Sequence, residues 1–412
     1  MEYGLIGLKL SHSFSPEIHK SFKKYEYELK EISAIKLGKF FKKKDFKGLN
    51  VTIPYKQAVM PYLDEISETA LKIGAVNTIV NKNGRLFGDN TDLFGVIYTL
   101  EKSKISVKDK TVAVLGSGGA SKTVVYALKH LGAKKIFVVS RQGRTNYNSI
   151  KKHKEVEIMI NASPVGMYPN NGECLVHLTD YPKLEGVVDL IYNPEITEFL
   201  AQAKNLGIKH INGLYMLVAQ AFKACEIFTD EKLDQSIIDK TVEMVRKETK
   251  NYTFIGMPGC GKTSIGKLVS EKSNREFFDC DLEFEMTYQL TPARYIEIFG
   301  EKSFREKENK VVESLCSQSR NVISTGGGAV INTENRKNIK SNSIVVWIKR
   351  DLEKLSTEKR PLSKNLEELK KLYATREKYY SEIADIIVEN NGDMKSVVEK
   401  TYKSIKDYKE QI

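Results

Sequence analysis

The chain has 412 residues, of which 41% are hydrophobic and 29% are charged, with 27 glycines and 10 prolines. These values exclude a disordered, collagen-like or mini-protein chain, and the length predicts two to three domains. The formal net charge of +12 is compatible with nucleic acid, but the basic residues are spread along the whole chain, so we expect small anionic substrates and no nucleic-acid partner.

Apolar stretches and cysteines indicate the compartment. The longest apolar stretches, such as residues 112–115 and 214–219, are far shorter than the roughly 20 residues of a membrane-spanning helix, and the N-terminus lacks a secretory pattern. The five cysteines form no C-x-x-C pair, which is typical of reduced thiols and not of a disulfide framework or a zinc site. We therefore expect a cytoplasmic protein with no membrane partner; the sequence leaves the oligomeric state open.

Short apolar runs alternate with helical stretches along the chain, and this alternation predicts α/β domains with parallel sheets. Two runs, residues 111–115 and 252–255, lead into glycine clusters that are each followed by a helix. Residues 230–250 read as one charged amphipathic helix. We place the main domain boundary near residues 247–251, where this helix ends and a new strand begins.

The first glycine cluster is Gly116-Ser-Gly118-Gly119-Ala120, between a predicted strand and a predicted helix. Without side chains, its backbone amides and the helix dipole can approach a pyrophosphate. The spacing is G-x-G-G, so by itself it indicates either a dinucleotide turn or an ordinary tight turn. Arg141 follows the next predicted strand, where an arginine favours the 2′-phosphate of NADP over NAD, unless it is only a surface charge.

Ordered motifs across residues 1–245 are more specific. They are His12-Ser13-x-Ser15-Pro16, Gly48-Leu-Asn-Val-Thr52-Ile-Pro54-Tyr-Lys56, Gly74-Ala-Val-Asn77-Thr78, Gly88-Asp89-Asn90-Thr91-Asp92-x-x-Gly95, Asn161-Ala-Ser163-Pro164-Val-Gly166-Met167, Asp189-Leu-Ile-Tyr192-Asn193-Pro194-x-x-Thr197 and Asn212-Gly213-Leu-Tyr-Met216-Leu-x-x-Gln220-Ala221. In these motifs the chain resembles the shikimate dehydrogenase family. The resemblance implies a two-lobed α/β enzyme with a Rossmann-type cofactor lobe, which reduces 3-dehydroshikimate to shikimate with NADP(H).

The resemblance also implies roles for individual residues. Lys56 would give a proton to the ketone oxygen as hydride reaches the carbon, and Asp92 would hold the lysine and bind a ring hydroxyl. Residues implied to bind the substrate are Ser13, Ser15 and Tyr192 at the carboxylate and Thr52, Asn77 and Gln220 at the hydroxyls. Residues implied to bind the cofactor are Gly116, Gly118, Gly119, Ala120, Arg141, Gly213 and Met216, of which Met216 reads equally well as a core residue.

The cofactor lobe departs from the family pattern. Asn161 follows Arg141 by only 20 positions, where the family has room for a helix, another strand and a further helix. We therefore expect the third strand of this lobe to be missing or remodelled. The preference for NADP then depends on Arg141.

The second glycine cluster, Gly256-x-x-x-x-Gly261-Lys262-Thr263, lies between a predicted strand and a predicted helix, which is the context of a Walker A loop. Its backbone amides can surround phosphates, Lys262 can neutralise the transferred charge, and the Thr263 hydroxyl can bind Mg²⁺. The pattern predicts an ATP site that also includes Gly259 and Ser264.

The motifs that follow are Phe278-Asp279-Cys-Asp281-x-x-x-Glu285, Ile298-Phe299-Gly300-Glu301-x-x-Phe304-Arg305-x-x-Glu308, Ser324-Thr325-Gly326-Gly327-Gly328, Arg360-Pro361-Leu362 and Arg376-x-x-x-Tyr380-x-x-x-Ala384. They resemble the shikimate kinase family over residues 251–400. The resemblance implies a P-loop α/β kinase that phosphorylates shikimate to shikimate 3-phosphate with ATP and Mg²⁺.

The kinase resemblance places Arg305 and Arg376 at the shikimate carboxylate and Asp281 at the attacking hydroxyl. Asp279, expected two residues away on the same side of an extended segment, would hold Mg²⁺ through water. Gly327 and Gly328 would let the backbone close on the acceptor. Arg360 would meet the ATP phosphates from a lid that is shorter than usual in this chain.

The product implied for the first half is the substrate implied for the second. Together the halves predict a bifunctional enzyme of the shikimate pathway, which leads to chorismate and the aromatic amino acids. We expect the dehydrogenase in residues 1–248 and the kinase in residues 249–412. Within the dehydrogenase we expect a substrate lobe (1–100), an NADP-binding lobe (101–215) and helices that return to the substrate lobe (216–248).

Two alternatives remain at this point. A non-catalytic sensor or repressor built from the same domains is disfavoured, because it would have lost catalytic side chains that are all present here. A dehydrogenase that also accepts quinate, which differs at one ring position, has the same motifs.

Overall fold

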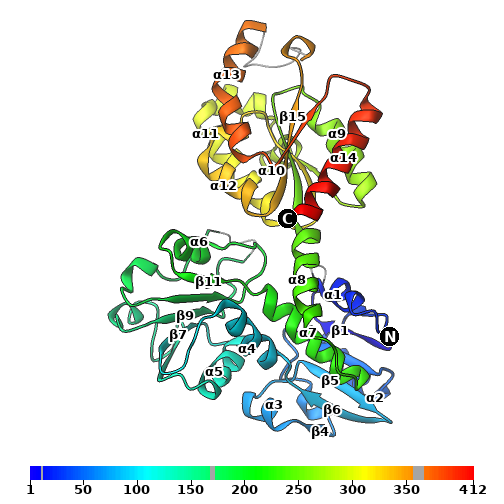
Figure 1. The fold of residues 1–412 in the computed structure, drawn as a ribbon, viewed down its shortest axis with the longest axis vertical. Coiled ribbons are helices and arrows are strands. Elements are labelled where there is room, and N and C mark those ends of the chain that lie inside the picture. The colour runs from blue at the N-terminus through cyan, green and yellow to red at the C-terminus, as the bar shows by residue number, and fades with distance from the viewer. Residues whose placement is uncertain (11–12, 168–171, 356–365) are drawn as a thin grey trace. The chain divides into compact units, whose positions relative to one another are not determined.

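The computed structural model describes residues 1–10, 13–167, 172–355 and 366–412. The described residues divide into two compact units, shown in Figure 1. The first contains residues 1–10, 13–166, 172–192 and 196–245, and the second contains residues 246–355 and 366–412 with the short segment 193–195 and residue 167. No helix in the described ranges is long and apolar enough to cross a membrane.

The first unit is built from short strands and helices. The strands are β1 (Tyr3–Gly7), β2 (Glu28–Glu31), β3 (Gly48–Val51), β4 (Glu65–Ile66), β5 (Thr78–Lys82), β6 (Arg85–Asp89), β7 (Thr111–Leu115), β8 (Lys135–Val139), β9 (Ile158–Asn161), β10 (Gly186–Asp189) and β11 (Lys209–Ile211). The helices are α1 (Ser15–Ser21), α2 (Ala34–Lys43), α3 (Glu68–Ile73), α4 (Asp92–Ser103), α5 (Gly119–His130), α6 (Glu198–Asn205), α7 (Leu214–Thr229) and α8 (Ser236–Thr249), the last of which runs on past Val245 into the second unit.

The N-terminal lobe of the first unit contains a mixed sheet, in the order β2-β1-β3-β5-β6-β4. Strand β1 pairs in parallel with β2 and β3, whereas β5 pairs antiparallel with both β3 and β6. The prediction of parallel sheets is therefore wrong for this lobe. For β5 and β6 the cause is local: Asn83 and Gly84, between these strands, both have positive φ, which produces the tight two-residue turn of a β-hairpin.

The second lobe of the first unit is a parallel sheet in the order β11-β10-β9-β7-β8. After β8 the chain passes through a short 3₁₀ helix (Ile150–Lys152) and enters β9 on the other side of β7. In the described chain, no strand follows β8 at this edge. This matches the expectation that the third strand of a Rossmann-type lobe is missing, because the connection is too short to form one.

Helices α4 and α7 lie against each other at Gly95, where a Cβ atom would stand 2.7 Å from the Met216 carbonyl oxygen. Glycine is therefore needed there for the helices to approach. Helix α7 ends at Asp230, which has φ +55°, and α8 begins only at Ser236. The prediction of one helix over residues 230–250 is thus wrong at its start, because the chain turns at Asp230.

The second unit is a parallel α/β domain. Its strands are β12 (Asn251–Ile255), β13 (Phe277–Asp279), β14 (Val322–Ser324), β15 (Ser343–Lys349) and β16 (Ile386–Glu389), in the sheet order β13-β14-β12-β15-β16. Its helices are α9 (Lys262–Ser273), α10 (Cys280–Tyr288), α11 (Pro292–Ser317), α12 (Thr333–Ser341), α13 (Leu366–Ile383) and α14 (Met394–Gln411). Figure 1 shows α9 and α14 on one side of this sheet and α11, α12 and α13 on the other. The central strands β12, β14 and β15 are buried on both faces, as a parallel sheet between helices requires.

Candidate active sites

The first candidate site lies where β5 and α4 begin. Lys56 Nζ donates to Asp92 Oδ2 at 2.6 Å, and the Asp92 side chain is 8% exposed. Asp92 is the first residue of α4, where the helix dipole favours a carboxylate. The two residues expected to act as a proton-transfer pair are therefore in direct contact.

Asn77 and Gln220 complete this cluster. Asn77 Nδ2 donates to the second carboxylate oxygen, Asp92 Oδ1, at 2.9 Å and lies 3.5 Å from Gln220 Oε1. Gln220 is on α7, which reaches the cluster because Gly95 allows α4 to pack closely. Side chains from four separate sequence motifs thus meet around one carboxylate.

The remaining residues expected at the substrate lie in the same lobe or at its edge. Ser13 Oγ and Ser15 Oγ are 3.1 Å apart at the start of α1, and Thr52 is partly buried after β3, with its methyl carbon beside Gly7. Tyr192 is partly buried with its ring 5.8 Å from that of Phe14, and burial raises its pKa.

The glycine turn after β7 leaves open space beside the start of α5. Gly116 has φ +118°, and a Cβ there would stand 2.8 Å from the Ala162 carbonyl oxygen, so this glycine is needed by the fold. Around Gly118 and Gly119, in contrast, no described atom lies within 4 Å of where a Cβ would stand. Gly118 is the N-cap of α5 and has no side chain to bond the first N–H groups, and Ala120 follows in the first turn. This open helix terminus fits the diphosphate of a dinucleotide.

The other residues expected to bind the cofactor lie at separate places in this lobe. Arg141 is exposed in the turn after β8. Gly213 precedes α7, and a Cβ there would stand 2.0 Å from the Leu190 carbonyl oxygen, so packing alone requires glycine. Met216 packs against the hydrophobic core of the cofactor lobe while its backbone contacts Gly95. The structure therefore supports Met216 as a core residue.

The second candidate site follows β12. Gly256, Gly259 and Gly261 all have positive φ, which turns successive N–H groups toward one concave side, as phosphate binding requires. Lys262 is buried, and its ammonium donates to the carbonyl oxygens of Gly256 and Met257, both at 3.0 Å. The next residues, Thr263 and Ser264, are exposed at the start of α9.

A pair of oxygen ligands lies beside this loop. Thr263 Oγ1 donates to Asp279 Oδ2 at 2.7 Å and is 3.3 Å from Ser324 Oγ. Hydroxyl and carboxylate oxygens are the ligands that Mg²⁺ prefers, so the donor set fits this ion. Asp281 is not on an extended segment with Asp279, as the sequence suggested, but in the first turn of α10, because Asp279 caps that helix by accepting from the Asp281 N–H.

The acceptor end of this site is formed around glycines 326–328. A Cβ at Gly328 would stand 2.5 Å from Arg305 Nη2, and a Cβ at Gly326 would stand 3.1 Å from Asp281 Oδ1. Arg376 Nη1 donates to the Gly327 carbonyl oxygen at 3.1 Å. The structure thus brings both arginines and Asp281 to one glycine segment. Arg360 lies outside the described residues.

Three buried polar groups were not selected from the sequence, two of them at the acceptor end of the second site and one at the end of β10. Glu308 accepts from Arg305 Nη1 at 2.8 Å, and burial raises the Glu308 pKa. Tyr380 donates its hydroxyl to the Gly327 carbonyl oxygen at 2.5 Å. Asp189, at the end of β10, accepts from the Ile191 N–H, Asn161 and Thr197, and burial raises its pKa to about 6. All three belong to quoted motifs, but their burial could be read only from the fold.

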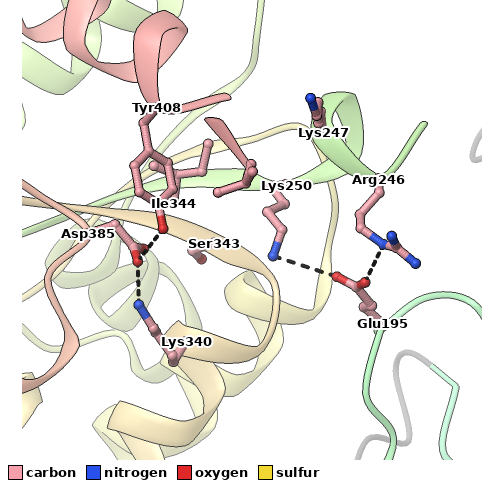
Figure 2. A pocket seen from close by; sticks show the side chains of 10 residues that line it. Glu195, Arg246, Lys247, Lys250, Lys340, Ser343, Ile344, Asp385 and Tyr408 are labelled. Atoms are coloured by element: carbon pink, nitrogen blue, oxygen red, sulfur yellow. Dashed lines mark hydrogen bonds and ion pairs between the residues drawn. The ribbon is translucent and has the colours of Figure 1, made fainter. Parts of the chain in front are cut away.

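A pocket in the second unit lies at the opposite edge of its sheet, near the start of β15 (Figure 2). Its lining residues include Ser343, Ile344 and four basic side chains, of which Lys340 pairs with Asp385 and Lys250 with Glu195. Ligands of parallel α/β sheets bind at the carboxyl ends of the strands, where the glycine loop lies, and this pocket is at the amino ends. We assign it no catalytic role.

Comparison with known proteins decides the family of the first unit. Over 267 residues the chain is 42% identical to the NADP(+) shikimate dehydrogenase of Clostridium beijerinckii, which covers 60% of this chain and 99% of that protein. The chain belongs to the shikimate dehydrogenase family. The family model for the shikimate dehydrogenase substrate binding domain matches residues 5–79.

Two solved shikimate dehydrogenases resemble the same part of the chain. Shikimate dehydrogenase 1 from Peptoclostridium difficile is 40% identical, with a TM-score of 0.56, over 60% of this chain and 98% of that one. The enzyme from Thermus thermophilus, solved with NADP(H) and shikimate, is 30% identical, with a TM-score of 0.55, over 59% of this chain and 99% of that one. Beyond the dehydrogenase part, the shikimate kinase family model matches residues 258–406.

Proposed function

We propose that the chain is a bifunctional enzyme of the shikimate pathway. Its N-terminal part reduces 3-dehydroshikimate to shikimate with NADPH, and its C-terminal part phosphorylates shikimate with ATP and Mg²⁺. The observation that carries the proposal is the contact of Lys56, Asp92 and Asn77 in a chain of the shikimate dehydrogenase family, followed in the same polypeptide by a Walker A loop and a shikimate kinase match.

In the reduction, NADPH supplies the hydride. Lys56 gives a proton to the ketone oxygen as negative charge develops there, and Asp92 holds the ammonium in position. Asn77 and Gln220 donate to or accept from ring hydroxyls, with Thr52 nearby, while Ser13, Ser15 and Tyr192 bind the carboxylate. The direct contact between Lys56 and Asp92 supports this assignment, because a proton donor must be fixed before the hydride arrives.

The cofactor is held at the open start of α5. Gly118, Gly119 and Ala120 present N–H groups to the diphosphate, and Arg141 binds the 2′-phosphate of NADP. Arg141 is exposed, so we expect its hydrogen bond to contribute to the free energy of NADPH binding at the low end of the range for charged groups, about 1.5 kcal/mol. Arg141→Ala should therefore raise the KM for NADPH about tenfold and leave the KM for NADH unchanged. A wild-type preference for NADH would contradict this assignment.

In the phosphorylation, ATP supplies the phosphoryl group and Mg²⁺ neutralises its charge. Gly259, Gly261, Lys262 and Ser264 bind the phosphates, Thr263 and Asp279 hold the ion, and Arg360 approaches from the lid. Arg305 and Arg376 bind the shikimate carboxylate, Gly327 and Gly328 contact the ring, and Asp281 orients the attacking hydroxyl and accepts its proton. The position of Arg305, Arg376 and Asp281 around glycines 326–328 supports this arrangement.

We further propose that residues 1–248 form the dehydrogenase, with a substrate lobe (1–100), a cofactor lobe (101–215) and returning helices (216–248), and that residues 249–412 form the kinase. The division of the structure between Val245 and Arg246 supports this partition.

We propose the cytoplasm as the compartment. All five cysteines have unpaired thiols in the described structure, which supports this proposal. We propose neither nucleic acid nor membrane as a partner.

Separate assays of the purified chain test the proposal. With 3-dehydroshikimate and NADPH but no ATP, we expect NADPH consumption; with shikimate and ATP·Mg but no NADPH, we expect ADP formation. Loss of both activities in the folded protein would favour the non-catalytic sensor. Reduction of NADP⁺ with quinate, at a rate comparable to that with shikimate, would show a broader dehydrogenase.

A further inference from the structure

The polar cluster around Asp92 continues into the interior of the substrate lobe. Asn77 Oδ1 accepts from the Thr91 N–H at 2.7 Å and lies 3.0 Å from Thr78 Oγ1. Thr78, Thr91 and Asn77 are each at most 2% exposed. Hydrogen-bond donors thus face the amide oxygen of Asn77, while its amide nitrogen faces the carboxylate of Asp92.

The next residue along this path is Asn50. The antiparallel pairing of β3 with β5 places Asn50 opposite Thr78, and Asn50 Nδ2 donates to Thr78 Oγ1 at 3.2 Å. Asn50 Oδ1 in turn accepts from the Tyr27 hydroxyl at 2.8 Å. Burial raises the Tyr27 pKa, so this hydroxyl keeps its proton and remains a donor.

These contacts order the donors along the path. Tyr27 donates to Asn50, and Asn50 donates to Thr78 Oγ1. The Thr78 hydroxyl in turn lies 3.0 Å from Asn77 Oδ1 and 3.0 Å from Thr91 Oγ1, so it joins the two groups that face the Asn77 amide oxygen. If the Asn77 amide were turned by 180°, its NH₂ group would face the Thr91 N–H, which can only donate, and its oxygen would face the Asp92 carboxylate. The buried groups would then be unsatisfied, which is costly in a low-dielectric interior.

We propose that Thr78 is a positioning residue for ketone reduction: its hydroxyl holds the Asn77 amide with the NH₂ group toward Asp92, and through Asp92 it fixes the ammonium of Lys56. The inference rests on the proposed proton transfer by Lys56. In the described part of the chain Thr78 makes no hydrogen bond to Lys56 or Asp92, and it acts through Asn77. Thr91 supports the same amide oxygen, so loss of Thr78 weakens the orientation without abolishing it.

The test compares Thr78→Val, Thr78→Ser and Thr99→Val in the full-length chain. Valine has the shape of threonine without the hydroxyl, and serine restores the hydroxyl. Thr99 is the matched control, because it is equally buried and its hydroxyl donates only along α4, to the Gly95 carbonyl oxygen. The readouts are kcat for 3-dehydroshikimate reduction per NADPH-binding site, counted by fluorescence titration, and the isotope effect with NADPH deuterated at the transferred position.

We expect Thr78→Val to lower kcat about tenfold, with an isotope effect no smaller than that of the wild type, because one lost hydrogen bond in a positioning path slows the chemical step by about a factor of ten. Thr78→Ser and Thr99→Val should remain within about threefold of the wild type. The inference is overturned if Thr78→Val keeps the wild-type kcat, if Thr99→Val loses as much, or if serine fails to restore the rate.

If Thr78→Val does not fold, Thr78→Ala replaces it against the same serine and Thr99 variants, and the same outcomes apply. If the wild type itself consumes no NADPH, the proposed function has failed, and the role of Thr78 fails with it. Failure of the positioning role alone appears as an active wild type with an unchanged Thr78→Val variant.

Discussion

The two candidate sites of this chain are built in different ways. In the dehydrogenase site, the functional side chains contact one another: Lys56 and Asn77 each donate to one oxygen of Asp92. In the kinase site, the absence of glycine side chains leaves room for other groups: Gly328 leaves room for the Arg305 guanidinium. Lys262 there donates to backbone carbonyl oxygens of its own loop.

This difference follows from the chemistry proposed for each site. Proton delivery to a ketone requires a donor at a fixed point, so a rigid network of side chains serves it. Phosphoryl transfer depends mainly on surrounding and neutralising a large anion, so backbone N–H groups and well-placed cations serve it. The comparison predicts that substitutions act on one activity at a time and that they act differently in the two sites.

The largest effect is expected from Lys56→Ala. Removal of the proton donor should lower the rate of ketone reduction by about 10²–10⁴, because general acid catalysis contributes this much. Phosphorylation of supplied shikimate by the same preparation should stay within a few-fold of the wild type, which also shows that the variant is folded. Parallel loss of both activities would mean that the two sites are not separate.

Arg305→Lys should weaken the acceptor end of the kinase site. The arginine bonds Glu308 and Glu301 and still has donors for a carboxylate, whereas one ammonium cannot replace its planar set. We expect the dissociation constant for shikimate to rise about 10- to 100-fold, measured by calorimetry. Binding of ADP·Mg should be unchanged, and near-normal shikimate affinity would remove Arg305 from the carboxylate clamp.

Acid pH should destabilise the substrate lobe. His19 is buried in the substrate lobe with its ring stacked 3.9 Å from that of Tyr27, and burial lowers the His19 pKa from 6.5 to about 3. Below pH 6.5 the unfolded histidine binds a proton that the folded one does not, so stability falls with pH, by about 3 kcal/mol at pH 4, and the loss is complete below pH 3.

His19→Phe removes this linkage. Urea denaturation followed by dehydrogenase activity should show a wild-type midpoint that falls steeply from pH 6.5 to pH 4 and a variant midpoint that falls less. The kinase activity of the same samples serves as the internal control. If the urea midpoints of the wild type and of His19→Phe depended equally on pH, His19 would be protonated in the folded lobe as readily as in the unfolded chain, and the account would be contradicted.

The smallest of these effects is expected from Gly328→Ala. Its Cβ would stand 2.5 Å from Arg305 Nη2, so the guanidinium must move and shikimate binding should weaken by about tenfold. The matched control is Gly392→Ala, where no described atom lies within 4 Å of the added Cβ and no change is expected. An unchanged KM for shikimate in Gly328→Ala would mean that the glycine is not needed for the clamp.

Local motifs could be predicted from the sequence, and tertiary arrangements only in part. The two strand-glycine-helix units and the missing strand after β8 were correct, because each depends on a short stretch of chain. The hairpin at Asn83 and Gly84 also has a local signal, because this dipeptide favours a two-residue turn, and it contradicts the expectation of parallel sheets in this lobe.

The contacts within the two sites could also be predicted only in part from the sequence. The contact of Lys56 with Asp92 could be expected from the family resemblance, but the helical position of Asp281 depends on the cap that Asp279 provides. Glu308 lies on a charged helix and reads as a solvated residue until packing buries it. The role of Thr78 requires the register between β3 and β5, which no local pattern specifies.

A coupled assay tests the central claim most directly. The wild-type chain is mixed with 3-dehydroshikimate and ATP·Mg, without added shikimate, and NADPH is added last while NADPH consumption and ADP formation are recorded together. We predict that ADP forms only after NADPH is added and that shikimate 3-phosphate accumulates. ADP formation before NADPH is added, or NADPH consumption that never leads to ADP, would contradict two consecutive reactions in one chain.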